Sequence, residues 1–151
     1  MQQKNNQVHT LTHTGVNILQ RIVTPVEIAN VLTGQIVSTK GLWDTGATGS
    51  SITKSMASAL GLISLGKRHV RGVHGINETD VYYVSITLDN KNITIKAKVT
   101  ECNELSHDKS VGLLIGMNII TMGDFAITNY QGATTMSFRV PSLQKIDFVN
   151  F

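Results

Sequence analysis

The sequence predicts a single, mainly β domain with one or two short helices. Three observations support this fold class. β-branched residues dominate from Ile18 onward, apolar and polar residues alternate with a period of two in several segments, and turn residues separate these segments at short intervals. The chain has 151 residues, 41% of them hydrophobic and 15% charged, which is ordinary for one folded domain.

The N-terminal part of the chain is polar and rich in Thr, Asn and Gln. We therefore expect residues 1–17 to form a loose polar arm and residues 18–151 to form the folded domain. Residues 18–23, in which Ile, Leu and Val stand on both sides of a Gln-Arg pair, are predicted to form the first strand. Pro25 is expected to interrupt that strand, because proline has no backbone N–H to donate.

The next segments predict a hairpin followed by a helix. Residues 26–32 and 35–43 are two strand-like runs separated by a Thr-Gly pair, which is typical of a β-turn. Thr53 is a suitable N-cap for a short helix over residues 54–60, because its hydroxyl can accept a hydrogen bond from the first turn. Gly61 is expected to end this helix.

The clearest alternation lies in the middle of the sequence. Apolar residues occupy every second position in residues 84–88 and again in residues 93–99, and the polar residues 89–91 separate the two runs. This pattern predicts a hairpin with one buried face.

The last third of the chain is predicted to contain two further strand regions. Residues 111–116 are apolar and punctuated by glycine, so we expect a short strand with protein on both sides. Residues 117–122 suit a second short helix. Residues 124–130 and 134–140 suggest another hairpin.

Charge and cysteine content exclude several classes of protein. The formal net charge is +3 with Lys and Arg scattered along the chain, so nucleic-acid binding has little support. The single cysteine, Cys102, cannot form an internal disulfide or a zinc site by itself. No apolar run reaches the length of about 18 residues that a membrane-spanning helix needs, and residues 1–14 lack the apolar segment of a secretory signal. We therefore expect a cytoplasmic protein that binds neither nucleic acid nor a membrane.

One acidic residue stands in a place that needs explanation. Asp44 follows an apolar run that ends at Trp43, and a carboxylate there costs free energy unless something nearby uses or solvates it. The segment Asp44-Thr45-Gly46-Ala47-Thr48 resembles the active-site loop of the retropepsin-like (retroviral-type) aspartic proteases, in particular their cellular and bacterial branch. The resemblance extends over roughly residues 26–130.

Two further segments support this resemblance. Residues 113–118 resemble the apolar-apolar-glycine segment that packs beneath the active-site loop in this family. The glycine-bracketed residues 70–76 stand where the family has its flap, a hairpin that covers the substrate. Because the chain contains only one Asp-[Thr/Ser]-Gly sequence, the resemblance implies a closed-barrel half-fold with one active site per homodimer, in which each copy contributes Asp44.

The resemblance also implies a role for each matching residue. Asp44 would be the catalytic residue, Thr45 would form hydrogen bonds across the dimer, and Gly46 would let the backbone approach the substrate. Substrate contacts would come from Ala47, Thr48, Gly72, Val73, His74, Gly75, Ile76, Leu114 and Ile115. The implied reaction is hydrolysis of peptide bonds in a peptide or protein substrate, with no metal or organic cofactor.

Two alternatives remain open from the sequence. Viral enzymes usually have an acidic residue at the position of Thr48 and an arginine at that of Met117, and both are uncharged here. The chain is therefore also consistent with a non-catalytic, dimeric peptide-binding or adaptor module on the same fold. A third reading is an unrelated β-barrel binding domain in which Asp-Thr-Gly is an ordinary turn.

Other candidate residues have simpler interpretations. His9 and His13 have the spacing of a metal-binding pair on a helix, but the Thr-rich surroundings favour a solvated arm. Cys102 is expected to be a buried or half-buried spectator. Ser50 and Ser51 are expected to form hydrogen bonds to the Asp44 loop from below. Residues 142–151 are candidates for strands at a dimer interface.

Overall fold

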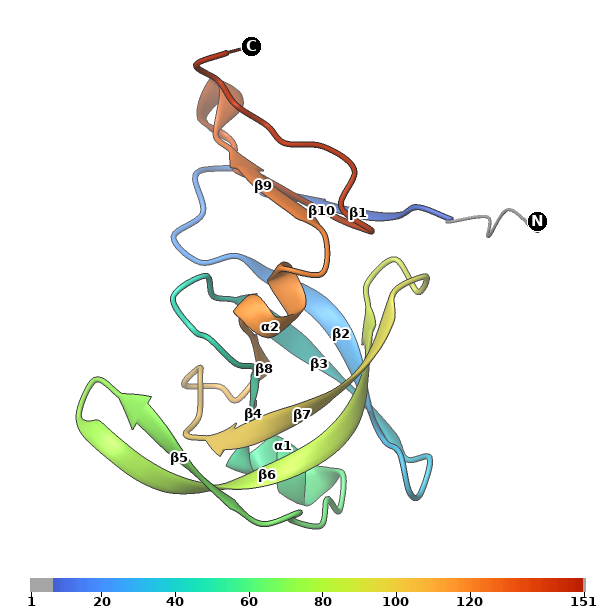
Figure 1. Ribbon diagram of the computed structural model, residues 1–151, viewed down its shortest axis with the longest axis vertical. Coiled ribbons are helices and arrows are strands. Elements are labelled where there is room, and N and C mark those ends of the chain that lie inside the picture. Colours follow the sequence, from blue (N-terminus) through green and yellow to red (C-terminus); the bar gives the residue numbers. More distant parts are fainter. Residues whose placement is uncertain (1–6, 151) are drawn as a thin grey trace.

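A closed β-barrel forms the body of the molecule in the computed structural model, which describes residues 7–150. The order of strands around it is β2-β3-β8-β4-β7-β6, and the pairing of β6 with β2 closes the ring (Figure 1). These strands are β2 (Val23–Asn30), β3 (Ile36–Trp43), β4 (Ser51–Thr53), β6 (Gly75–Leu88), β7 (Thr94–Cys102) and β8 (Val111–Ile115). The predicted mainly β fold with a closed barrel is therefore confirmed.

The β2–β3 hairpin is confirmed, but the predicted strand before it is wrong. Residues 18–22 are irregular, and β2 begins at Val23 and includes Pro25. Pro25 is tolerated because β2 pairs with β6 only from Val26 onward, so the missing N–H removes no hydrogen bond from that pairing. The turn between the strands contains Gly34 with a φ of 76°, a conformation that glycine adopts without strain.

The predicted helices are both present and short. Helix α1 (Lys54–Ala59) begins after Thr53, whose Oγ1 accepts a hydrogen bond of 3.3 Å from the N–H of Met56. Gly61 follows the helix with a φ of 60°. Helix α2 (Met117–Ile120) follows β8 directly.

The two predicted central strand regions are confirmed. The alternating segments form the antiparallel pair β6–β7, although β6 starts earlier, at Gly75. Its first residues pair with β5 (Lys67–Gly72), which extends the sheet beyond the barrel. Strand β8 lies between β3 and β4, so it has protein on both sides as predicted.

A second, three-stranded sheet brings together the first and the last strand of the described chain. Its order is β1 (His9–Thr14), β10 (Thr135–Val140) and β9 (Asp124–Thr128), with a short 3₁₀ turn, η1 (Tyr130–Gly132), between β9 and β10. The predicted hairpin of residues 124–140 is thus present. Figure 1 shows this sheet beyond the end of the barrel where α2 lies.

The expectation of a loose N-terminal arm is wrong for residues 9–14. These residues form strand β1, which is antiparallel to β10. Leu11 is only 5% exposed, and Thr12 Oγ1 lies 2.8 Å from Ser137 Oγ on the other face. Apolar burial on one face and a hydroxyl pair on the other thus stabilise a strand whose sequence looks polar. Residues 1–6 of the predicted arm lie outside the described residues, and the domain boundary at residue 17 stays a prediction.

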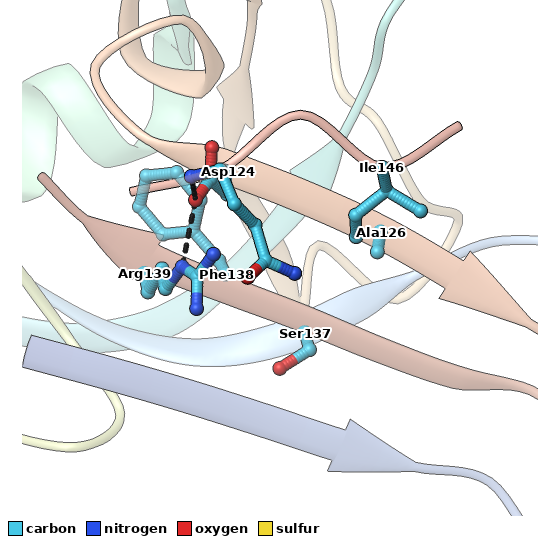
Figure 2. A pocket seen from close by; sticks show the side chains of 7 residues that line it. Asp124, Ala126, Ser137, Phe138, Arg139 and Ile146 are labelled. Atoms are coloured by element: carbon cyan, nitrogen blue, oxygen red, sulfur yellow. Dashed lines mark hydrogen bonds and ion pairs between the residues drawn. The ribbon is translucent and has the colours of Figure 1, made fainter. Parts of the chain in front are cut away.

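The C-terminal segment forms no strand within this chain, and its part in a dimer interface stays a prediction, with Phe151 outside the described residues. Residues 141–150 run without regular secondary structure. Their attachment point is the carboxylate of Asp124 at the start of β9, which accepts hydrogen bonds from the Leu143 N–H at 2.8 Å and from Ser142 Oγ. Arg139 Nε donates to the same carboxylate at 2.7 Å. Figure 2 shows Asp124, Arg139 and Ile146 around the small cavity that this segment helps to enclose.

The core joins the barrel to the three-stranded sheet through aromatic side chains. The buried Trp43 at the end of β3 stacks on Phe125 of β9, with ring centroids 5.5 Å apart, and meets Phe138 of β10 at 5.2 Å. These contacts fix the three-stranded sheet relative to Asp44, the residue that follows Trp43 in the chain. Among the described residues, no helix is long and apolar enough to cross a membrane.

Candidate active site

Asp44 directly follows the last residue of β3, beside the end of the buried strand β8. Strands β3 and β8 are parallel, so their carboxyl ends meet at one edge of the barrel. The N–H of Asp44 donates to the carbonyl oxygen of Ile115 at 2.9 Å, which extends the pairing by one residue. The preceding Trp43 is anchored by a buried hydrogen bond of 3.0 Å from its Nε1 to Thr24 Oγ1. The backbone at Asp44 is therefore fixed from two sides.

The loop after Asp44 is a tight turn around its carboxylate. Oδ1 of Asp44 accepts a hydrogen bond of 2.8 Å from the Gly46 N–H, and the Asp44 carbonyl accepts one of 3.3 Å from the Ala47 N–H. Asp44 and Ala47 are half-buried, whereas Thr45, Gly46 and Thr48 are exposed. Within residues 7–150, Asp44 forms no ion pair. The carboxylate is thus held in place by the backbone and remains open to solvent.

The start of α2 clamps the far side of this loop. The N–H of Met117 donates to the Ala47 carbonyl at 2.8 Å, and the N–H of Asn118 donates to the Thr48 carbonyl at 3.0 Å. At Gly116 a Cβ atom would overlap the backbone of Gly49, so only glycine fits there. The apolar-apolar-glycine segment therefore packs against the Asp44 loop.

The side chains of Ser50 and Ser51 do not form the hydrogen bonds to the Asp44 loop that the sequence led us to expect. Ser50 Oγ donates to Asn118 Oδ1 at 2.7 Å and accepts from the Gly116 N–H at 3.0 Å. Ser51 Oγ lies 2.9 Å from Thr100 Oγ1 on β7. Ser51 is the first residue of β4 and faces the neighbouring strand β7, whereas Ser50, just before the strand, faces the start of α2. Ser50 and Asn118 thus support the loop through α2, a link that no local sequence pattern indicates.

The two expected pocket residues on β8 differ in their surroundings. Leu114 is half-buried, but Ile115 is 0% exposed and belongs to the core. Successive side chains of a strand point to opposite faces, so adjacent residues cannot both line one surface. Ile115 can therefore shape a pocket only from beneath, and the expectation that it contacts a substrate directly does not fit its burial.

The predicted flap segment is the tip of a projecting hairpin. Strands β5 and β6 are antiparallel and in register to the pair Gly72–Gly75, and Val73 and His74 close the turn. Gly75 has a φ of 114°, which side chains rarely allow. All of residues 72–76 are exposed, and Val73 is 98% exposed. The hairpin extends from the barrel on the side where the loop after β3 lies (Figure 1).

The remaining candidate residues do not join this site. Cys102 is half-buried, and burial, together with the carboxylates of Glu104 and Glu101, raises the pKa of its thiol to about 12. His9 and His13 lie on β1 rather than on a helix. In the described part of the chain, no three His, Cys, Asp or Glu side chains are grouped so that they would hold a metal ion.

Comparison with known proteins agrees with this geometry. The retropepsin-like aspartic protease from Rickettsia conorii has a similar structure, with a TM-score of 0.60 at 16% identity over 93% of this chain and 99% of that one. Weaker similarities are found to the retroviral protease-like domain of Ddi1 from Leishmania major (TM-score 0.49, 18% identity, 87% and 100% coverage) and to EIAV protease in complex with the inhibitor HBY-793 (0.48, 23%, 70% and 90%). No curated protein matches the chain.

A family model described as aspartyl protease matches residues 24–119. This region is well over half of the chain and includes nearly all of β2, strand β3, the Asp44 loop, the β5–β6 hairpin, β8 and most of α2. The structural similarity to the Rickettsia conorii protein independently supports the same fold. The chain therefore belongs to the aspartyl protease family and has the retropepsin-like fold.

Proposed function

We propose that the chain is an aspartic endopeptidase that acts as a homodimer and hydrolyses peptide bonds. The observation that carries this proposal is the position of Asp44, a half-exposed carboxylate that two hydrogen bonds with backbone groups fix at the end of the parallel strands β3 and β8. Membership of the aspartyl protease family supports it. The sequence has only one such Asp-Thr-Gly loop, so the second carboxylate has to come from a second copy of the chain.

Two facing Asp44 carboxylates would provide the acid and the base. Two like charges at a separation of about 3 Å cannot both be ionised, so the pair shares one proton, as aspartic-protease dyads are known to do. The ionised carboxylate removes a proton from a water molecule, whose oxygen attacks the peptide carbonyl carbon. The protonated carboxyl gives its proton to the carbonyl oxygen. As the C–N bond breaks, the leaving amine takes up the proton that the first carboxylate removed from water, and a hydroxyl of the tetrahedral intermediate returns a proton to the second carboxylate. Activity is therefore expected to be highest at mildly acidic pH, where the dyad holds one proton.

The surrounding residues have roles that follow from their positions. Thr45 is exposed next to Asp44 and would form hydrogen bonds to the partner loop, while Gly46 and Ala47 leave the backbone accessible to a peptide. Leu114 would line an apolar pocket. The exposed hairpin tip, residues 72–76, would close over the peptide and exclude water. A cytoplasmic location is part of the proposal, since a reducing compartment suits the single free thiol.

The test is digestion of a diverse peptide mixture by the wild type and by Asp44→Asn, from acidic to neutral pH. Asparagine has nearly the same shape, and its Oδ1 can still accept from the Gly46 N–H, so the loop and the dimer should persist. We expect cut peptides with the wild type only, and dimers of both proteins in size-exclusion chromatography.

Two results would contradict the proposal. Undiminished cleavage by Asp44→Asn would show that the activity does not depend on this carboxylate. A folded, dimeric wild type that binds peptides and never cuts them would instead support a peptide-binding or adaptor module.

A further inference from the structure

One face of the barrel sheet can be followed from β3 to the β5–β6 hairpin. Directly opposed residues of neighbouring strands project to the same side of a sheet. The registers connect a series of opposed residues across five strands, namely Leu42 of β3, Leu114 of β8, Ser51 of β4, Thr100 of β7 and Val81 of β6. Ser51 Oγ lies 2.9 Å from Thr100 Oγ1, so these two side chains do share one face. We call this the Asp44 face, for the reason that follows.

The other face of these strands is the core. The sequence neighbours of the five residues belong to the hydrophobic core, namely Trp43, Ile115, Ile52, Val99 and Tyr82. Asp44 is separated from Leu42 by the buried Trp43, and its N–H continues the pairing with β8. Strand alternation therefore puts Asp44 on the same face as Leu42. A peptide bound at Asp44 would lie on this face.

The Asp44 face continues onto one side of the hairpin. Val81 is only 7% exposed although it lies outside the hydrophobic core, and alternation along β6 puts Thr79 and Asn77 on its side. Val70 is opposed to Asn77, and both Val70 and Thr79 are half-buried. Thr79 Oγ1 donates a hydrogen bond of 2.8 Å to the Glu101 carbonyl. This side of the hairpin therefore faces the end of β7 (Figure 1).

A cavity of about 560 Å³ lies between this side of the hairpin and the end of β7. Its walls include Val70, Asn77 and Thr79 of the hairpin, together with Cys102, the last residue of β7, and Asn103 after it. The volume is large enough for an amino-acid side chain. Strand β7 is three strand spacings of about 4.8 Å from β3, so the cavity lies within about four extended residues of a bond held at Asp44.

The cavity is polar, but no charged side chain projects into it. In the described part of the chain, no basic residue lines it. Burial and the carboxylates of Glu104 and Glu101 raise the pKa of the Cys102 thiol to about 12, so the thiol is neutral. Glu101 Oε2 instead accepts a hydrogen bond of 2.7 Å from Tyr82 on the core side, and alternation puts Glu78 on that side as well. These carboxylates contribute a negative potential without pointing into the cavity.

We propose that this cavity binds a Gln or Asn side chain of the substrate and that Asn77 selects it, an inference that rests on the proposed protease function. Asn77 and Asn103 are exposed, so their amides lose water when a peptide covers them and need new partners. A substrate carboxamide offers both a donor and an acceptor. An apolar side chain offers neither. A carboxylate would meet negative potential with no cation nearby, and an ammonium group would lose water without a carboxylate to replace it.

The test compares kcat/KM for peptides with Gln, Met or Glu, which are similar in size, at each of four positions on either side of the cut bond. At one position Gln should exceed Met about fivefold, as expected for one hydrogen bond between neutral groups, and should exceed Glu at least about tenfold. Asn77→Leu should reverse the order of Gln and Met. His69→Ala is the control, because His69 is exposed and opposed to Glu78 on the other side of the hairpin, and it should keep the wild-type order.

Binding to the inactive protein separates failure of this inference from failure of the proposed catalysis. The same peptides are titrated into Asp44→Asn and into the double variant Asp44→Asn/Asn77→Leu. Tighter binding of the Gln peptide to Asp44→Asn, lost in the double variant, supports the role of Asn77 even where no peptide is cut. Equal affinity for the Gln and Met peptides at every position, binding of neither peptide, or an equal loss of preference in His69→Ala and Asn77→Leu overturns it.

Discussion

The contact between Gly116 and the Asp44 loop makes Gly116→Ala a sharp test of how the site is held. A Cβ atom at this position would overlap the carbonyl group of Gly49 and lie 2.9 Å from the carbonyl oxygen of Ala47. Both obstacles are backbone atoms, so no side-chain rotation relieves the overlap. Either the Asp44 loop or the start of α2 has to move.

The size of the effect can be estimated from the contacts that such a movement breaks. Overpacking of this kind costs about 1–3 kcal/mol. The hydrogen bonds from Gly116 N to Ser50 Oγ and from Met117 N to the Ala47 carbonyl would also be strained, at about 1 kcal/mol each. The free energy of unfolding should thus fall by about 3–5 kcal/mol, which corresponds to a decrease in Tm of roughly 6–20 °C for a domain of this size.

The assay is thermal and denaturant unfolding of Gly116→Ala beside Gly49→Ala. Gly49 lies in the same loop, but a Cβ there would meet nothing within 4 Å, and its φ is not in the left-handed region. Gly49→Ala should therefore unfold at nearly the wild-type temperature. Equal Tm values for Gly116→Ala and the wild type would refute the tight packing of Gly116 against the Asp44 loop. An equal decrease in Tm for Gly116→Ala and Gly49→Ala would show that the decrease does not come from the contact at Gly116.

Three other predictions follow from single contacts. Thr24→Val leaves the buried indole N–H of Trp43 without its acceptor, so the free energy of unfolding, measured in denaturant, should fall by about 1–3 kcal/mol. An unchanged free energy of unfolding would contradict the hydrogen bond between Trp43 and Thr24. Cys102 should react with iodoacetamide at pH 8 far more slowly in the folded protein than in the denatured one, because its raised pKa of about 12 leaves almost no thiolate, and equal rates would argue against this. The pKa of Asp124 is lowered by hydrogen bonds from Leu143, Ser142 and Arg139. Its ionised form therefore stabilises the folded state at pH values above the ordinary carboxyl pKa, and this stabilisation is lost as the pH falls below it. Asp124→Asn should thus lower Tm at neutral pH, and the difference in Tm from the wild type should become smaller as the pH is lowered. A difference in Tm that does not change with pH would contradict a stabilising role of the ionised carboxylate.

Local patterns in the sequence were sufficient for much of the fold. Alternation predicted the β6–β7 hairpin, the Thr-Gly turn predicted β2–β3, and Thr53 predicted the start of α1. These predictions were correct because hairpins and capped helices depend on residues that are close in sequence. The Asp44 loop and the flap hairpin were identifiable for the same reason, since each is a short segment with its own turn chemistry.

The features that the sequence did not predict depend on distant residues. Strand β1 forms by pairing with β10, which lies more than a hundred residues later in the chain. Within residues 9–14 themselves, only Leu11 indicates a buried face. The support of the Asp44 loop by Ser50 and Asn118 joins residues that are 68 positions apart. The orientation of β8 in the barrel decides which of two neighbouring apolar residues is accessible, so the sequence pattern alone does not distinguish the half-buried Leu114 from the buried Ile115.

The central proposal is that two Asp44 carboxylates from two copies form one active site, and subunit mixing tests it most directly. Wild-type protein is mixed with Asp44→Asn in increasing proportion at constant total concentration, and peptide cleavage is measured after exchange. If both carboxylates are needed, activity falls with the square of the wild-type fraction, to about a quarter in an equal mixture. A linear fall, to about one half in the equal mixture, would show that each copy works with its own Asp44 alone and would contradict the shared site.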